Sequence, residues 1–110
     1  MKKKDKDRLL LAEGMGKFAR IREGSGNDEG PDNCALCEEY FDDGKCNGCP
    51  IMDKTGLVRC LDTPYPAWEE HQSIEHDSDF KDMRIYDDCP QCKALSMKEF
   101  NFLAALFSEL

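Results

Sequence analysis

Seven cysteines in a chain of 110 residues are the feature that most restricts how this protein can fold. Six of them form three CxxC pairs and one stands alone: Cys34/Cys37, Cys46/Cys49, Cys89/Cys92 and Cys60. Two thiolates three residues apart on a tight turn can bind one zinc ion at about 2.3 Å, and two such pairs complete a tetrahedral site. The pattern therefore predicts structural zinc, with one or two ions per chain.

The apolar composition points to the same need for a metal. Leu, Ile, Val and Phe together account for 21 of the 110 residues, and the net charge is −8. Chains of this composition usually bury too little apolar surface to offset the entropy lost on folding. Metal binding can supply folding free energy directly. We therefore expect one small domain whose folding depends on its metal.

The lengths of the apolar segments indicate the compartment. Only residues 9–12 form an apolar segment after the charged start, which is too short for a secretory signal, and no run of 18 apolar residues could span a membrane. We expect a cytoplasmic protein. In that reducing environment, paired cysteines bind metals or perform redox reactions more often than they form disulfides.

The spacing leaves two schemes of zinc ligands open. In a local scheme, the Cys34/Cys37 pair binds together with the neighbouring pair, or with one member of it and Cys60. In a scheme that spans the domain, one ion is bound by Cys34, Cys37, Cys89 and Cys92. The second ion would then be bound by Cys46, Cys49, Cys60 and either His71 or His76. A solvated side chain on an acidic helix is the alternative interpretation of each histidine.

Periodicity and turn residues predict a small α+β domain with an irregular, zinc-stapled core. Residues 1–22 contain a basic helix from residue 6, and residues 23–33 lack large apolar side chains and are predicted to form a linker. Residues 34–110 form the zinc-binding domain. Inside it, Gly56 between two short apolar segments, 51–52 and 57–59, indicates a short β-hairpin.

Two further helices are expected in the zinc-binding domain. One begins near Thr63 and continues to about Glu75, and the other covers residues 93–109. The apolar face of the last helix is wide, because eight of the residues 100–110 are apolar. It either packs into the chain's own core, against Leu11, Met15, Phe18 and Trp68, or presents Phe102 and Leu106 to a second copy of the chain or to a partner.

Charge is distributed unevenly along the chain. Residues 1–22 carry a net charge of +5, whereas the remaining residues carry −13. The acidic body suits a basic protein surface and opposes the approach of duplex DNA. We therefore expect a protein partner rather than duplex DNA. The alternative is a zinc-ribbon nucleic-acid-binding protein that uses residues 2–22 as its basic arm.

Catalysis is not expected. The Cys89/Cys92 pair resembles a dithiol redox motif, but the acidic residues 77–88 before it lack the pattern of the buried strand that a thioredoxin-like motif follows. Glu69, Glu70 and His71 do not have the HExxH spacing of a catalytic zinc site. A thiol redox enzyme is therefore the least favoured interpretation.

A longer motif carries a resemblance to known proteins. It consists of Cys34-x-x-Cys37, Cys46-x-Gly48-Cys49-Pro50, Thr55-Gly56 and Cys60-x-x-Thr63-Pro64-Tyr65. This motif is similar to that of a group of small cysteine-rich proteins encoded by tailed phages and prophages. Those proteins often end in an EFxFL-like helix, which Glu99-Phe100-Asn101-Phe102-Leu103 resembles. The resemblance implies a phage-encoded accessory protein that acts on a host or phage protein in the host cytoplasm.

Overall fold

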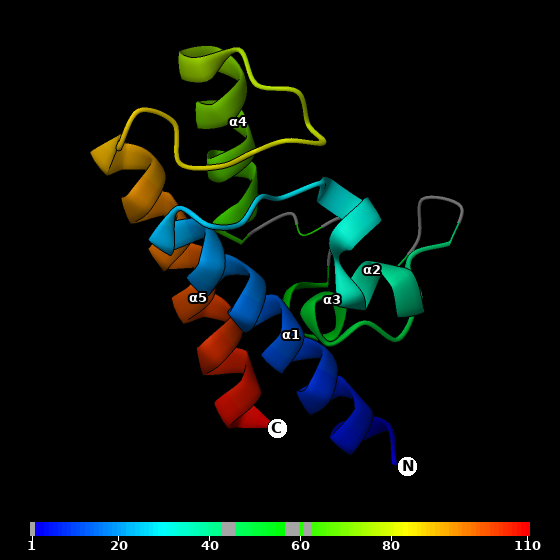
Figure 1. Cartoon of the computed structure of the whole chain (residues 1–110). Coiled ribbons are helices and arrows are strands. Elements are labelled where there is room, and N and C mark those ends of the chain that lie inside the picture. The colour runs from blue at the N-terminus through cyan, green and yellow to red at the C-terminus, as the bar shows by residue number, and fades with distance from the viewer. Residues whose placement is uncertain (1, 43–45, 57–59, 61–62) are drawn as a thin grey trace.

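The computed structural model describes residues 2–42, 46–56, 60 and 63–110. Its elements in chain order are α1 (Lys3–Glu23), the 3-10 helix η1 (Gly30–Asn33), α2 (Ala35–Tyr40), α3 (Pro50–Thr55), α4 (Tyr65–His76) and α5 (Pro90–Glu109). The two long helices, α1 and α5, pack side by side in antiparallel directions (Figure 1). Helix α4 packs against the N-terminal part of α5.

The interface between α1 and α5 is only partly apolar. Helix α1 buries Asp7, Leu11, Phe18 and Ile21. Helix α5 buries Cys92, Ser96, Glu99, Leu103 and Leu106, which recur at the spacing of one helical face. Gly14 allows the two helices to approach closely, because a Cβ at this position would lie 3.3 Å from Leu103 Cδ1. The buried faces of the two helices therefore combine large apolar side chains with small and polar ones.

The prediction of an α+β fold with a β-hairpin is wrong. Helices make up 68% of the described residues, which contain isolated bridges but no sheet. Residues 51–52, expected as a strand, belong to α3, and residues 57–59 lie outside the described part of the chain. Pro50 begins α3 and Gly56 ends it with a φ of 76°. This order of Pro and Gly is typical of the two ends of a helix, so the positive φ of Gly56 serves a helix cap instead of a hairpin turn.

The three helices predicted from the sequence are present, with different ends. Helix α1 already begins at Lys3. Helix α4 begins at Tyr65, whose N–H donates to the hydroxyl of Thr63 at 3.1 Å. Helix α5 begins at Pro90, with Cys89 as its N-cap, one turn earlier than the apolar pattern indicates.

The chain itself covers much of the apolar face of α5. Leu106 is 6% exposed and lies in the same core as Leu11 and Trp68. Phe102 is partly buried and packs against that core. Of the two residues that could contact a second copy or a partner, Leu106 is therefore buried inside the chain and Phe102 is partly covered.

The segment 23–33, expected as a linker, contains the fully buried Asp28. Its carboxylate accepts four hydrogen bonds of 2.8–3.0 Å, from Lys17 Nζ, the Gly30 N–H, Tyr65 OH and Trp68 Nε1. Its backbone pairs with Met83 in an isolated bridge. A buried carboxylate is tolerated when its oxygens are satisfied in this way. Asp28 thereby joins α1, α4 and the loop that precedes α5.

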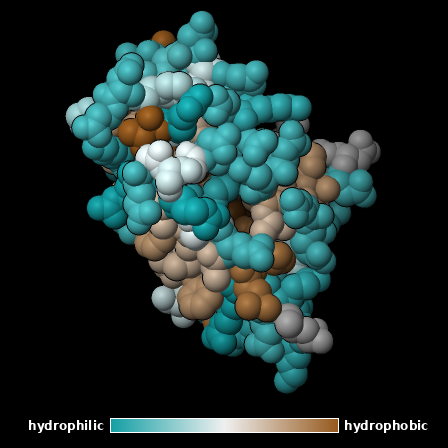
Figure 2. Space-filling view, viewed as in Figure 1, coloured by the Kyte–Doolittle hydropathy of each residue, from teal (hydrophilic) through white to brown (hydrophobic). Residues whose placement is uncertain are grey.

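The surface is mostly polar on the side shown in Figure 2. Three large apolar side chains are exposed among the described residues: Leu9, Ile74 and Phe80. None of the described helices combines the length and the apolar character needed to cross a bilayer.

Candidate metal centre

Two histidines of α4 and two cysteines at the start of α5 come together in the structure. The ligand atoms of His71, His76, Cys89 and Cys92 all lie within 4.8 Å of one another. Cys89 Sγ is 3.5 Å from His71 Nε2, and Cys92 Sγ is 3.3 Å from His76 Nε2. In a tetrahedral zinc site, with Zn–S of about 2.3 Å and Zn–N of about 2.0–2.1 Å, sulfur and nitrogen ligands lie about 3.5 Å apart. This group, the His/Cys site, therefore fits one four-coordinate metal ion.

The end of α4 sets the positions of the two histidines. His76 is the last residue of the helix, and Asp77 follows it in the left-handed conformation with a φ of 48°. The His76 ring stacks on Tyr86, with ring centroids 5.2 Å apart, and lies edge-to-face with His71 at 5.0 Å. The aromatic contact with Tyr86 therefore orients His76 toward the site.

The cysteine pair occupies the N-terminus of α5. Cys89 is the N-cap, and its sulfur accepts the N–H of Cys92 at 3.5 Å. This N–H has the largest effect on the pKa of the Cys89 thiol, and together with the rings of His76 and His71 it lowers that pKa to about 6. The thiolate is the form that binds metals, so Cys89 is available as a ligand at neutral pH. Burial raises the pKa of Cys92.

Gln72 supports the site from the buried side of α4. Its amide nitrogen donates to Cys92 Sγ at 3.3 Å and to the carbonyl of Arg84 at 2.8 Å. Its carbonyl oxygen accepts the N–H of Arg84 at 3.0 Å. Hydrogen bonds of this kind orient ligands in metal sites. Gln72 also ties α4, the loop and α5 together through protein contacts alone.

The remaining cysteines gather around the starts of α2 and α3. We refer to Cys34, Cys37, Cys46, Cys49 and Cys60 as the five-thiol cluster. The Cys34 thiol is hydrogen-bonded to the Cys37 thiol, and this bond has the largest effect in lowering its pKa to about 6. The pKa of Cys37 is raised, first by the bond to Cys34 and by burial, and further by the charges of Cys34, Cys60 and Cys46. No three of the described cysteines have sulfur atoms all within 4.8 Å of one another, so this cluster is looser than the His/Cys site.

The sequence had suggested that either His71 or His76 binds an ion together with Cys46, Cys49 and Cys60, and the structure shows a different grouping. The domain-spanning scheme is not formed, because Cys89 and Cys92 lie beside His71 and His76 and not beside Cys34 and Cys37. From the sequence, the two histidines were alternatives for one ligand position, whereas the structure brings both of them to the same cysteine pair. The signal that could have found them is their spacing: His-x4-His and Cys-x2-Cys are the spacings of Cys2His2 zinc sites, here in reversed order along the chain.

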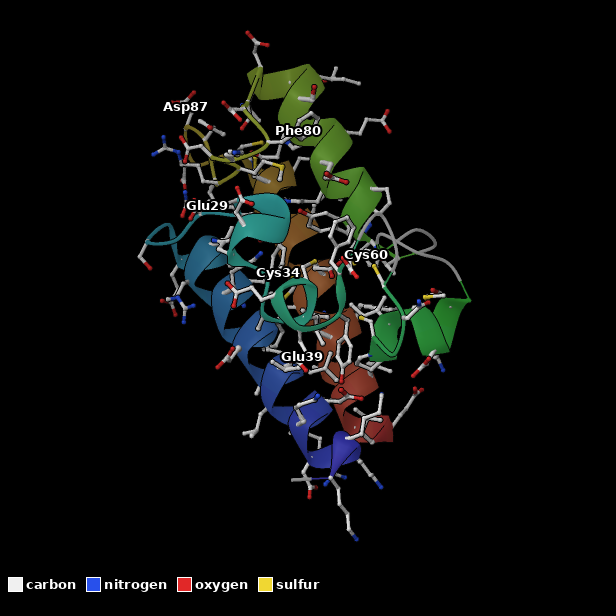
Figure 3. All side chains as sticks on the ribbon, turned by 90° about the vertical axis from the view of Figure 1, so that its right-hand side faces the viewer. Glu29, Cys34, Glu39, Cys60, Phe80 and Asp87 are labelled. Atoms are coloured by element: carbon white, nitrogen blue, oxygen red, sulfur yellow. The ribbon has the colours of Figure 1, made fainter. Side chains whose placement is uncertain are left out.

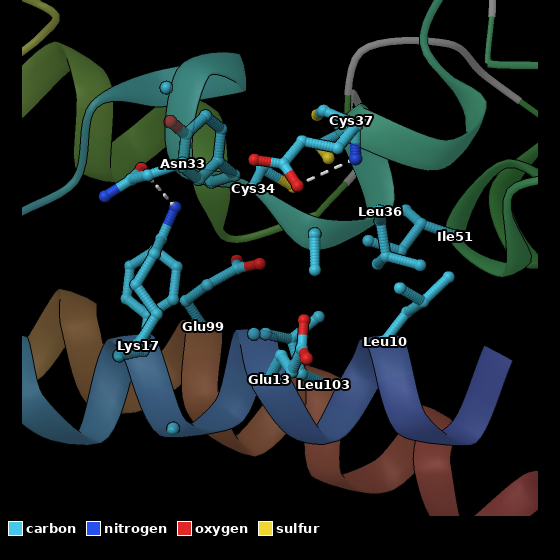
Figure 4. Close-up of a pocket in the computed structure, with 18 of the residues that line it drawn as sticks. Leu10, Glu13, Lys17, Asn33, Cys34, Leu36, Cys37, Ile51, Glu99 and Leu103 are labelled. Atoms are coloured by element: carbon cyan, nitrogen blue, oxygen red, sulfur yellow. Dashed lines mark hydrogen bonds between the residues drawn. The ribbon is translucent and has the colours of Figure 1, made fainter. Parts of the chain in front are cut away.

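A cavity of about 1270 Å³ is lined by residues of α1, α2 and α5 and by three members of the five-thiol cluster. Its polar lining includes Lys17, Cys34, Cys37 and Glu99 (Figure 4). Cys60 also lines it. Glu99 is 2% exposed, and its Oε2 atom has no hydrogen-bond partner within the described structure. Burial, and then the charge of Asp28, raise the pKa of Glu99 to about 8. This carboxyl group is therefore mostly protonated at neutral pH.

Comparisons with models of protein families, with curated proteins and with solved structures found no match to this chain. The function is therefore inferred from the placement of its own residues.

Proposed function

We propose that this chain is a non-enzymatic, protein-binding accessory protein whose fold is stabilised by zinc at the His/Cys site. One observation carries the proposal: four protein ligands of the Cys2His2 type converge on one point. Thiolate and imidazole ligands in a tetrahedral arrangement favour zinc. Four protein ligands leave no open position for a substrate or an activated water, which is typical of structural sites and not of catalytic ones.

Charge and exposed apolar side chains support a protein partner with a basic surface. Residues 23–110 carry a net charge of −13. Ile74 and Phe80, 69% and 55% exposed, line a shallow hollow on α4 together with Glu69, Glu70 and Ser73. Apolar side chains surrounded by polar ones are typical of protein interaction sites. The resemblance to phage-encoded proteins suggests a host or phage protein as the partner, in the host cytoplasm.

Metal analysis of the full chain tests the structural role. Protein purified without added metal should contain zinc, and His71→Ala/His76→Ala should lose one equivalent. Glu75→Ala is the matched control, because this exposed residue lies on the same helix between the two histidines. A melting temperature that is unchanged after stringent chelation, with no metal bound, would contradict the stabilising role of zinc.

Capture experiments test the partner. A protein captured from bacterial lysate should be released by salt and should bind Ile74→Ser/Phe80→Ser more weakly than the wild type, while Leu9→Ser, which changes the other exposed apolar residue, binds normally. We expect no submicromolar complex with duplex DNA in a mobility-shift assay. Such a complex, abolished when the five basic residues among 2–8 are neutralised, would favour the zinc-ribbon nucleic-acid-binding alternative.

A further inference from the structure

The five-thiol cluster is outside the proposed zinc site, and three separate segments of the chain contribute to it. Cys34 and Cys37 belong to the start of α2, and Cys46 and Cys49 precede α3. Cys46 and Cys49 are buried, while Cys34, Cys37 and Cys60 are partly buried. In Figure 3, Cys34 and Cys60 lie on the face turned toward the viewer. The convergence of five thiols therefore requires an explanation beyond the local sequence.

The first pair repeats the geometry found at the His/Cys site. Cys34 is the N-cap of α2, and its sulfur accepts the N–H of Cys37 at 3.3 Å. Cys89 and Cys92 form the same turn at the start of α5, with a distance of 3.5 Å. An N–H that points at a thiolate stabilises the charged, metal-binding form of the sulfur.

The second pair forms a tight turn that depends on glycine. The Cys49 N–H donates to the carbonyl of Cys46 at 3.0 Å. Between them, Gly48 has a φ of 89°, and a Cβ there would lie 3.2 Å from the ring of Tyr40. Both the backbone conformation and the close approach therefore require glycine. A tight turn places two thiols three residues apart within reach of one ion.

Helix α3 has few other anchors. The extensive contacts between described elements join α1 with α5, α1 with α2, α4 with α5 and α2 with η1, but none involves α3. Its ion pairs with other helices, Lys3 with Asp53 and Lys54 with Glu109, are exposed. Exposed ion pairs contribute about 0–1 kcal/mol each. Pro50 and Ile51 are buried together with Cys46 and Cys49, and Met52 packs against the same core, so local apolar burial is the main protein contact of this part of the chain.

We propose that the five-thiol cluster binds a second metal ion through the thiolates of Cys34, Cys37, Cys46 and Cys49, independently of the His/Cys site. The four thiols release their protons on binding and draw together around the ion. The ion links α2 to α3. Cys60, whose φ of 60° is unusual for a residue other than glycine, lines the cavity beside the site and is the surplus thiol.

Zinc stoichiometry of the full-length protein tests this proposal. The wild type should bind two zinc ions per chain, and Cys34→Ser/Cys37→Ser should bind one. His71→Ala/His76→Ala should also bind one, through the other site. Cys60→Ser is the matched control and should retain both ions.

Cobalt substitution of the wild type gives a reading that does not depend on the folding of any variant. Two cobalt ions should bind in two steps with different thiolate-to-metal charge-transfer intensities, because one site has four sulfur ligands and the other has two. If the wild type binds one metal ion per chain and Cys34→Ser/Cys37→Ser also binds one, the second site is overturned. If the wild type binds one metal ion per chain and this variant binds none, the second site is supported and zinc at the His/Cys site is contradicted.

Discussion

The His/Cys site and the five-thiol cluster use the same cysteine turn in different surroundings. At the His/Cys site, the buried residues Trp68, Gln72 and Met83 hold α4, the loop and α5 together. The five-thiol cluster lies where α3 makes no extensive contact with another described helix. Protein packing therefore arranges the first set of ligands before any metal binds. At the second set, the proposed metal ion would add order that the local burial of α3 does not supply.

The ligand distances agree with this difference. The sulfur–nitrogen distances of 3.3 and 3.5 Å at the His/Cys site already match the edges of a tetrahedral zinc site. At the five-thiol cluster, no three of the described sulfur atoms all lie within 4.8 Å of one another. Loss of metal should therefore have unequal consequences for the two regions.

Loss of the second site should produce the largest effect. In Cys34→Ser/Cys37→Ser, the amide protection of α2 and α3 should fall by on the order of 1000-fold, which corresponds to about 4 kcal/mol of lost local stability. Protection in α1 and α5 should persist, because these helices pack directly on each other. Hydrogen exchange measured by mass spectrometry checks both regions at once. Equal loss of protection in α1 and α3 would show that the two regions do not differ as proposed.

The second prediction concerns the protein contacts of the packed region. Asp28→Ala leaves the Lys17 ammonium, 11% exposed, without its buried counter-charge, and should destabilise the fold by about 3 kcal/mol. Zinc content should not change. Chemical denaturation and metal analysis are the measurements, with exposed Asp32→Ala as the control. If Asp28→Ala were neutral to stability, the claim that protein contacts order this region would fail.

The third prediction concerns the His/Cys site. In His71→Ala/His76→Ala, the melting temperature should fall by roughly 10 °C, a loss of about 2 kcal/mol, because the packing of α4 on α5 remains. Scanning calorimetry measures this change. Global unfolding of the variant would mean that zinc, and not packing, orders this region as well.

The fourth prediction concerns Glu99, between the two regions. The pKa of its carboxyl group is raised from 4.5 to about 8 in the folded protein, so the native state holds a proton that the unfolded chain releases. The contribution of Glu99 to the free energy of unfolding should be greatest below pH 4.5 and should decline as the pH rises to 8. The decline between pH 6 and 8 should be about 2 kcal/mol. Glu99→Gln should remove this decline, whereas exposed Glu109→Gln should keep it. Parallel pH profiles of urea denaturation for the wild type and Glu99→Gln would contradict the raised pKa.

Three of the helices were predictable without tertiary information: periodic apolar residues mark α1 and α5, and Thr63 and Pro64 mark the start of α4. The hairpin prediction failed because a glycine with a positive φ serves equally well as a turn residue and as a helix cap, and Pro50 at the other end decides for the helix. The role of Asp28 was not predictable. Its four hydrogen-bond donors come from three elements that meet only in the folded chain.

The candidate metal ligands were predictable as residue types but not as groups. The CxxC spacing identifies Cys89 and Cys92, and the His-x4-His spacing marks a histidine pair. The assignment of these two pairs to each other depends on the packing of α4 against α5, a long-range contact that single-sequence patterns do not encode.

X-ray absorption at the zinc edge of the fully loaded wild-type protein tests the central claim most directly, because it counts the ligand types of every bound ion. With one Cys2His2 site and one four-cysteine site, the average zinc should have three sulfur ligands at about 2.3 Å and one imidazole nitrogen at about 2.0–2.1 Å. An average shell of two sulfurs and two nitrogens would eliminate the second site. A shell of four sulfurs would eliminate the histidine ligands, and with them the account of the His/Cys site.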